Sequence, residues 1–336
     1  MSKEREDKVL FLLVFVVYCL LCFYVPRVYN GLPDELSPQV TAVIPSGVNA
    51  RDAAEIFVKA GAADDAKALA RAMYKSGIDR HILPGLYTLQ KSTPSGIVQQ
   101  LATTKPVVHK VTLIPGSRLG RISSTFGKNS DGVSCLEIAL AKNENFPQQI
   151  RSWLPEKAEQ RMMFLLPETY FTAPGPRMAD DFVKRASALW YARVGNKVPP
   201  ESDAASVMKS GILASVIEGE AKAADERPIL AGIFLKRLEK NMKLQSCATV
   251  IYAWEEVNVK KHHLTYRDLE IKSPYNTYIV EGLPPGPICV PSEGSWLAAL
   301  SPKESEYLFF FAGKDGRHIF SKSYNEHLSK QRRMGM

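Results

Sequence analysis

The chain has 336 residues, of which 45% are hydrophobic and 23% are charged, and its formal net charge is +8. This composition excludes a disordered, collagenous or disulfide-stapled protein, and the length allows about two domains of ordinary size. A basic surplus this small is compatible with binding to an anionic polymer or to a membrane surface. Because no basic run is interleaved with aromatic residues, we expect no nucleic-acid partner.

The first feature along the chain is an apolar run without any charge, residues 9–25, which reads VLFLLVFVVYCLLCFYV. A helix over this run is about 26 Å long, at the short end of what a membrane span requires. The residues around Cys22 are bulky and offer no small-residue cleavage site, so an uncleaved anchor is favoured over a signal peptide. Basic residues precede the run, and we therefore expect the N-terminus in the cytoplasm.

These features predict a single-pass protein of the cell (inner) membrane. The expected organisation is a cytoplasmic tail at 1–8, a transmembrane helix at 9–25 and a linker at 26–37. Everything after about residue 26 is expected in the periplasm or an equivalent extracytoplasmic space.

Cysteine and histidine spacing predicts neither a disulfide framework nor a metal site. Three cysteines lie outside the apolar run, Cys135, Cys247 and Cys289, and their spacing is irregular. The six histidines are scattered and form no ligand pattern with the cysteines. We therefore expect no metal.

The exported part begins with short strands and helices that predict a small α/β domain over 38–106. The apolar patterns indicate two strands and three helices there, at 40–44 and 85–89 and at 50–59, 62–76 and 95–102.

The rest of the chain, 107–330, is predicted to be mainly helical with a few strands. The expected helices are at 120–126, 180–194, 204–217 and 227–242. The expected strands are at 111–114, 275–280 and 307–311.

Five ordered blocks of sequence stand in the second half of the chain. They read ILASVIEGE, ERPILAGIFLKRL, KLQSCATVIYAW, YNTYIVEGLPPGPI and YLFFFAGKDGRHIFSKSYNEH, and they begin at Ile212, Glu226, Lys243, Tyr275 and Tyr307. In this order and spacing they resemble the MltG/YceG-like family, whose members are membrane-anchored endolytic murein transglycosylases. The resemblance extends over nearly the whole exported chain.

The resemblance implies a fold and an activity. The fold class is α+β, with a membrane anchor, a small LysM-like α/β domain at 38–106 and a mainly helical α+β catalytic domain at 107–330. The implied reaction is non-hydrolytic cleavage of the β-1,4 bond between MurNAc and GlcNAc in nascent strands, which leaves a 1,6-anhydroMurNAc end. No cofactor is implied. The implied partners are peptidoglycan strands, the membrane, and proteins of cell-wall synthesis or division.

Glu218 is the residue that the resemblance places at the family's catalytic glutamate. Glycosidic cleavage needs an acid for the leaving oxygen, and Glu218 follows the apolar Val216 and Ile217, a setting that favours an uncharged carboxyl. By spacing alone, a solvated helix end is the more common interpretation. Glu220 lies about 200° further round a helix, so the two carboxylates face one site only if Gly219 ends the helix.

Seven further residues are candidates for substrate binding or for support of the catalytic residue: Glu220, Glu168, Arg227, Gln245, Tyr275, Asn276 and Thr277. Their other interpretations stay open. Glu168 stands at the family's aspartate position and suits a turn equally well. Arg227 and Arg237 could bind the carboxylates of murein or form ion pairs on a helix surface. Gln245 could form a hydrogen bond to an N-acetyl group or cap a helix. The stretch 275–277 could line a groove or form a strand in the core.

The chain departs from the family's pattern at three places. Met162 and Met163 stand where the family has an acidic residue and a glycine, and Cys247-Ala248 replaces Asp-Pro. Val290–Ser292 replaces Asn-Pro-Gly. These changes keep a second function open, that of a catalytically weak or inactive, membrane-anchored scaffold that binds glycan.

Overall fold

The structure, a computed structural model, describes residues 17, 38–45, 47–261 and 263–335. The expected cytoplasmic tail, the linker and all of the expected transmembrane helix except residue 17 lie outside the described residues. Among the residues that are described, no helix combines the length and apolar character needed to cross a membrane.

The chain forms two compact units, and each is described by itself. The first extends to His109 and includes Phe171–Met178, and the second consists of Lys110–Tyr170 and Ala179–Met336. The LysM-like identity of 38–106 and the limits of the catalytic domain stay predictions.

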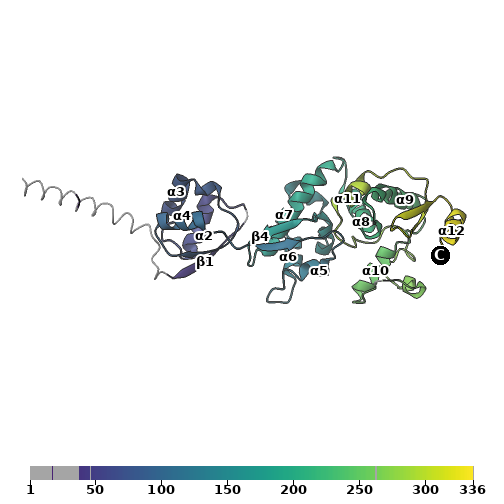
Figure 1. The fold of residues 1–336 in the computed structure, drawn as a ribbon, viewed down its shortest axis with the longest axis horizontal. Coiled ribbons are helices and arrows are strands. Elements are labelled where there is room, and N and C mark those ends of the chain that lie inside the picture. Colours follow the sequence, from purple (N-terminus) through teal and green to yellow (C-terminus); the bar gives the residue numbers. More distant parts are fainter. Residues whose placement is uncertain (1–16, 18–37, 46, 262, 336) are drawn as a thin grey trace, which may run out of the picture. The chain divides into compact units, whose positions relative to one another are not determined.

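The first unit combines a two-stranded sheet with three helices. Its elements are β1 (Gln39–Ile44), α2 (Ala50–Lys59), α3 (Ala66–Ser76), a 3-10 helix (Ile78–Arg80), β2 (Gly85–Gln90) and α4 (Pro94–Thr103). β1 and β2 pair antiparallel, and α2, α3 and α4 gather beside β1 (Figure 1). The order of strands and helices is the one that the hydrophobic pattern predicts.

Helix caps and a shared apolar core hold this unit together. Asn49 and Asp65 precede α2 and α3, and the side-chain oxygen of each accepts two N–H bonds from the first turn. The apolar faces meet around Phe57, whose ring lies edge-on to Tyr87 of β2 at 5.7 Å. The unit therefore has a hydrophobic core of its own.

The elements that follow are mainly helical, with two short strand pairs. The strands are β3 (His109–Thr112) with β4 (Thr169–Thr172) and β5 (Phe309–Ala312) with β6 (His318–Ser321). The α-helices are α5 (Leu119–Ser123), α6 (Cys135–Ala141), α7 (Met178–Arg193), α8 (Ala204–Glu220), α9 (Arg227–Glu239), α10 (Cys247–Glu256), α11 (Glu293–Leu300) and α12 (Tyr324–Arg333). Short 3-10 helices lie at Asn143–Asn145, Gln148–Trp153, Ala158–Phe164, Gly195–Lys197, Ala224–Glu226 and Tyr266–Glu270.

Helix α8 is the centre of the second unit. It packs against α9, α10 and α11, and Figure 1 shows α8, α9 and α11 together. Gly211 permits this packing, because a Cβ at that position would lie 2.4 Å from Sδ of Met163 and 2.8 Å from the ring of Trp296. Met163 is therefore a core residue, and Trp296 also packs edge-on against Trp190 at 5.1 Å.

The expected helix at 227–242 is shorter in the structure, and Arg237 gives the physical reason. α9 ends at Glu239, and the buried Arg237 guanidinium donates hydrogen bonds to the carbonyls of Lys243 and Leu244. These bonds turn the chain back beside the helix. Nε of Arg237 also donates to the carbonyl of Leu308. Because its donors are bonded to backbone carbonyls, Arg237 is not available to a murein carboxylate.

The expected strand at 275–280 is wrong, because these residues form successive turns. The buried side-chain amide of Asn276 donates to the carbonyls of Leu269 and Ile271. The backbone carbonyl of Asn276 accepts bonds from the N–H groups of Ile279 and Val280. The β-branched and aromatic residues of this stretch predicted hydrogen bonds to a neighbouring strand. Bonds from side chains and within turns take their place.

Candidate active site

Glu218 lies in the last turn of α8, directly after a run of buried residues from Gly211 to Ile217. Asp203 caps the start of this helix by accepting a 2.8 Å bond from the N–H of Ser206. Gly219 brings α10 close, since a Cβ there would lie 2.6 Å from that of Ala248. The helix continues to Glu220, so Gly219 does not end it before the second carboxylate.

Three donors hold one oxygen of the Glu218 carboxylate. Oε2 accepts bonds from the N–H of Ser292 at 3.0 Å, from the hydroxyl of Ser292, and from the hydroxyl of Ser295 at 2.6 Å. The other oxygen, Oε1, lies 4.0 Å from Nη2 of Arg227, and only 8% of the Glu218 side chain is exposed. The carboxylate is therefore fixed in position with Oε1 as its less occupied oxygen.

Glu220 forms its hydrogen bonds with a different helix, α10. Its Oε1 accepts bonds from the hydroxyl of Ser246 and from the N–H of Ala248 at 3.1 Å. Both donors stand at the start of α10, where a negative charge is favourable because the first N–H groups of a helix have no partner within it. As the helical angle predicts, Glu218 and Glu220 bind different parts of the fold.

The stretch from Tyr275 to Thr277 supplies one cavity residue and two buried supports. Tyr275 lines a cavity described below, while Asn276 and Thr277 are buried. The hydroxyl of Thr277 accepts from the N–H of Ser246 at 3.0 Å and lies 2.9 Å from that of Thr249. Thr277 thus supports the residue that contacts Glu220, and it does not face solvent.

Gln245 and Glu168 are both exposed. Gln245 has a left-handed backbone (φ 48°), and its N–H donates to the carbonyl of Thr277 at 3.1 Å. Glu168 precedes β4, and its carboxylate accepts a 3.0 Å bond from the N–H of Thr169. The structure therefore joins Gln245 to the support of Glu220 and places Glu168 in the role of a turn carboxylate.

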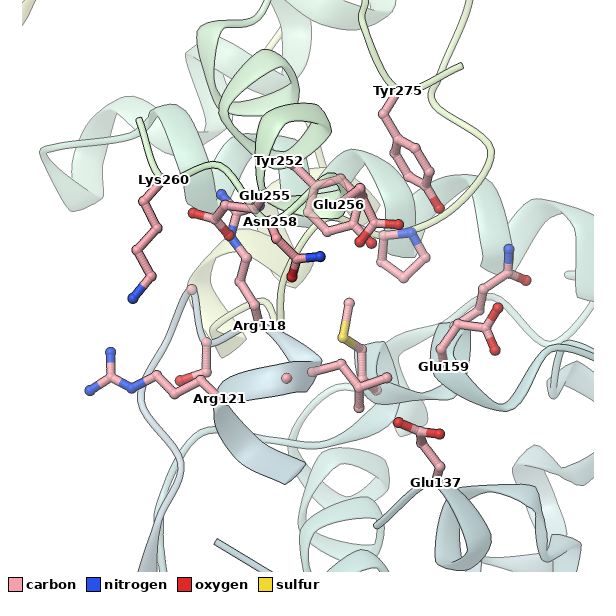
Figure 2. Close-up of a pocket in the computed structure, with 17 residues that line it drawn as sticks. Arg118, Arg121, Glu137, Glu159, Tyr252, Glu255, Glu256, Asn258, Lys260 and Tyr275 are labelled. Atoms are coloured by element: carbon pink, nitrogen blue, oxygen red, sulfur yellow. The ribbon is translucent and has the colours of Figure 1, made fainter. Parts of the chain in front are cut away.

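A cavity of about 1000 Å³ lies in the same unit, and we call it the charged cavity. Its charged walls are formed by Arg118, Arg121, Lys260, Glu137, Glu159, Glu255 and Glu256, and its aromatic walls by Tyr252 and Tyr275 (Figure 2). Nε of Arg118 pairs with Glu255 at 2.8 Å, and its guanidinium lies 5.0 Å from the ring centre of Tyr252. Met162 also lines this cavity, at the place where the family's pattern has an acidic residue.

The two tyrosines of the charged cavity stay protonated at neutral pH. Their ring centres are 4.6 Å apart. Burial raises the pKa of both phenols, and the nearby Glu256 carboxylate adds to the effect. They therefore present neutral hydroxyls and apolar ring faces to whatever occupies the cavity.

The segment from Pro287 to Ser292 joins the charged cavity to Glu218. Pro287 lines the cavity, and Ser292 binds Glu218. Between them, Val290 exchanges two 2.9 Å backbone bonds with Gly116 and Ser117, which are also cavity residues. The cavity wall and the donors of the carboxylate are thus parts of one connected segment.

Buried Cys289 lies in this segment between the two features. Burial and the nearby Glu218 charge raise the pKa of its thiol to about 12, and Arg118 acts in the opposite direction. Cys289 is therefore a packing residue and no nucleophile. Within the described ranges, no group of three His, Cys, Asp or Glu side chains could hold a metal ion.

Sequence reasoning missed four residues that define the site, namely Ser292, Ser295, Arg118 and Tyr252. The spacing of Ser292 and Ser295 is a helix-capping pattern that a search for the start of α11 would have found. No sequence signal connects these serines to Glu218, or Arg118 to Tyr252. The fold alone brings them together.

The chain is similar to known proteins over most of its length. A model of the YceG-like family matches residues 42–333. The endolytic murein transglycosylase of Bacillus subtilis (strain 168) is 32% identical over 257 residues, which cover 72% of this chain and 70% of the relative. That of Streptococcus pneumoniae (strain R6) is 26% identical over 89% of this chain, which spans 60% of the relative. A crystal structure of a yceG-like protein from Listeria monocytogenes matches with a TM-score of 0.54 and 27% identity, covering 87% of this chain and 98% of that chain.

Proposed function

Because this chain belongs to the YceG-like family, we propose that it is an endolytic murein transglycosylase, a lyase that cuts within peptidoglycan strands. It cleaves the β-1,4 bond between MurNAc and GlcNAc and leaves a 1,6-anhydroMurNAc end. The observation that carries this proposal is the Glu218 carboxylate, nearly buried and fixed through Oε2 by three donors.

One carboxyl suffices for both halves of this reaction. Glu218 in its acid form gives its proton to the glycosidic oxygen, which leaves as the 4-hydroxyl of GlcNAc while positive charge develops at C1 of MurNAc. The carboxylate then takes the proton from the C6 hydroxyl of the same sugar, whose oxygen closes the anhydro bridge to C1. No water is consumed, and Glu218 ends in the acid form in which it began.

The contacts of Glu218 support different roles for its two oxygens. Since Oε2 already accepts three bonds, the proton that moves in the reaction is carried on Oε1. Arg227 lies 4.0 Å from Oε1 and stabilises the negative charge that remains after the proton has left. Glu220 is engaged at the start of α10, so it does not act as a second catalytic carboxyl of a hydrolase.

The departures from the family's pattern leave this arrangement intact. Met163 is a core residue against Gly211, and Cys247 begins α10 without touching Glu218. The third departure supplies Ser292, which adds a donor to the carboxylate. These contacts support catalysis more directly than they support a scaffold role.

The product identifies the reaction. Murein strands incubated with the full chain should acquire anhydro ends, which are lighter by one water molecule than the reducing ends that a hydrolase leaves. New reducing ends would assign the protein to the hydrolases, and the absence of new ends would refute the enzymatic function.

We further propose that residues 9–25 anchor the protein in the cell membrane, with the catalytic unit outside the cytoplasm. The uncharged apolar run and the basic residues before it support this topology. Such an anchor would bring the site to nascent strands and to proteins of cell-wall synthesis or division. A mature N-terminus near residue 26, found by sequencing, would refute the uncleaved anchor.

We also propose that the first unit positions the glycan, as a LysM-like domain would. Its separate core supports an independent role. Deleting residues 38–106 should weaken binding to murein strands. If the shortened protein binds and cleaves strands as well as the full chain does, the unit is a spacer.

A further inference from the structure

We propose that the charged cavity binds the peptide stem of the murein strand, taking up its free carboxylates on one side and its free amine on the other. The inference rests on the proposed function, because the stem is attached to the lactyl group of the MurNAc unit on which Glu218 acts. It assigns to the cavity a ligand of one chemical class, a short zwitterionic peptide.

The charges of the cavity are separated in space. Arg121 and Lys260 lie on one side of it, and Glu137 and Glu159 lie on the opposite side (Figure 2). A ligand with a carboxylate at one end and an amine at the other would satisfy both sides at once. A glycan of neutral sugars offers no partner for either.

These four side chains are also available for a ligand. All four are exposed, and none has an ion-pair or hydrogen-bond partner for its charged group within the described part of the chain. Arg118 differs, because Glu255 already pairs with it. Glu256 also lines the cavity, and its carboxylate is hydrogen-bonded to Tyr252. The two cations and the two carboxylates without such a partner therefore determine which ligand the cavity selects.

The size and lining of the cavity suit a peptide. Its volume of about 1000 Å³ is at the upper end of the range of roughly 300–1,000 Å³ that is usual for small-molecule sites. The ring faces of Tyr252 and Tyr275 supply an apolar wall for alkyl side chains.

The distance from Glu218 to the cavity is within the reach of a stem peptide. Val290, which is bonded to Gly116 and Ser117 in the cavity wall, is two residues from Ser292, at most about 7 Å along the chain. A stem of four residues extends to about 14 Å. A MurNAc unit at Glu218 is therefore able to place its stem in the cavity.

Two matched substrates test this inference with the full chain. One is an uncross-linked glycan strand that carries its stems, and the other is the same strand after an amidase has removed them. We expect kcat/KM for anhydro-end formation to be higher by about tenfold or more on the strand with stems. Equal values on the two strands would overturn the inference and leave the proposed function standing.

Charge variants locate the effect within the cavity. Arg121→Gln/Lys260→Gln should lower kcat/KM on strands with stems more than on stripped strands, so that the preference for stems is lost. The control, Lys240→Gln/Lys314→Gln, removes the same charge from exposed positions outside the cavity and should retain the preference. Equal losses on both substrates in the first variant would contradict the inference.

The acidic side has its own test. Acetylation of the stem amine should lower kcat/KM for the unmodified protein but not for Glu137→Gln/Glu159→Gln. Binding gives a readout that needs no cleavage: calorimetry with a synthetic murein tetrapeptide should show binding that Arg121→Gln/Lys260→Gln removes. An absence of tetrapeptide binding to the unmodified protein would refute the inference, whether or not the protein cleaves strands.

Discussion

Ser292 donates two hydrogen bonds to the same oxygen of Glu218, one from its backbone N–H at 3.0 Å and one from its hydroxyl. The two residues are 74 positions apart in the sequence and meet where α11 begins beside the end of α8. A glycine, which the family's pattern has at this position, would lack the hydroxyl and therefore the second bond. This departure therefore strengthens the hold on the carboxylate.

Removing the Ser292 hydroxyl should slow the reaction. A hydrogen bond to a charged group is worth about 1.5–3 kcal/mol, so we expect Ser292→Ala to lower kcat by about tenfold or more, with KM little changed. Ser292 also caps α11, and the alanine variant should lose about 1 kcal/mol of stability. Steady-state kinetics and thermal unfolding measure the two effects separately.

Ser292→Gly distinguishes positioning from folding. Glycine is a better cap than alanine, so this variant should keep more of the stability while it shows the same loss in kcat. If kcat of both variants equals that of the unmodified protein, the hydroxyl has no part in holding Glu218 for catalysis.

Arg227 should matter for activity and little for folding. Replacing it with glutamine removes the cation beside Oε1 of Glu218, and we expect kcat to fall about tenfold or more. Arg227→Lys keeps the charge and should retain most of the activity. A glutamine variant with unchanged kcat would show that this cation does not stabilise the carboxylate during the reaction.

Arg237 should matter for folding, because its guanidinium is bonded to three backbone carbonyls in the interior. Arg237→Met leaves these acceptors without donors, and a cost of about 3 kcal/mol or more in the free energy of unfolding is expected. The exposed Lys240→Met is the matched control and should change stability by less than about 0.5 kcal/mol. Similar melting temperatures for the two variants would contradict the structural role of Arg237.

Asp268 gives the second unit an acid-sensitive contact. Bonds from Lys261 and from Thr265 hold the pKa of Asp268 at about 2, below the value of about 3.9 for an unfolded chain. Its stabilising contribution is therefore complete above about pH 4 and is lost as the pH falls towards 2. At pH 7, Asp268→Asn should have a lower melting temperature than the unmodified protein, and this difference in melting temperature, the gap, should narrow below pH 4. Melting curves over pH 3–7 measure it. A gap that is constant over this range would be the contrary result.

Elements with strong local signals were predictable from the sequence. The apolar spacing predicts α2 at its observed bounds, Ala50–Lys59, and the start of α8 at Ala204. The stretch at 275–280 failed because its composition favours a strand, whereas Asn276 forms side-chain bonds that only the folded chain makes available. Local propensity was overridden by tertiary contacts there.

The site was predictable only in part, because its partners come from distant segments. A family-like block is the basis for proposing Glu218, and the helical angle predicts that Glu220 faces other partners, as the structure shows. The residues that fix the carboxylate, Ser292 and Ser295, lie on a different helix, and no periodic pattern records that contact. The charged cavity likewise combines segments that are remote in sequence, from Arg121 to Lys260.

The end groups formed by three proteins on the same murein strands test the central claim most directly. The unmodified chain should produce anhydro ends, Glu218→Gln should produce them at least about 10²-fold more slowly, and Glu220→Gln should lose less than about tenfold, because glutamine still accepts the bonds at the start of α10. Mass analysis of the strands measures all three rates. Anhydro ends formed by Glu218→Gln at the unmodified rate would contradict the account, since another residue would then be the acid.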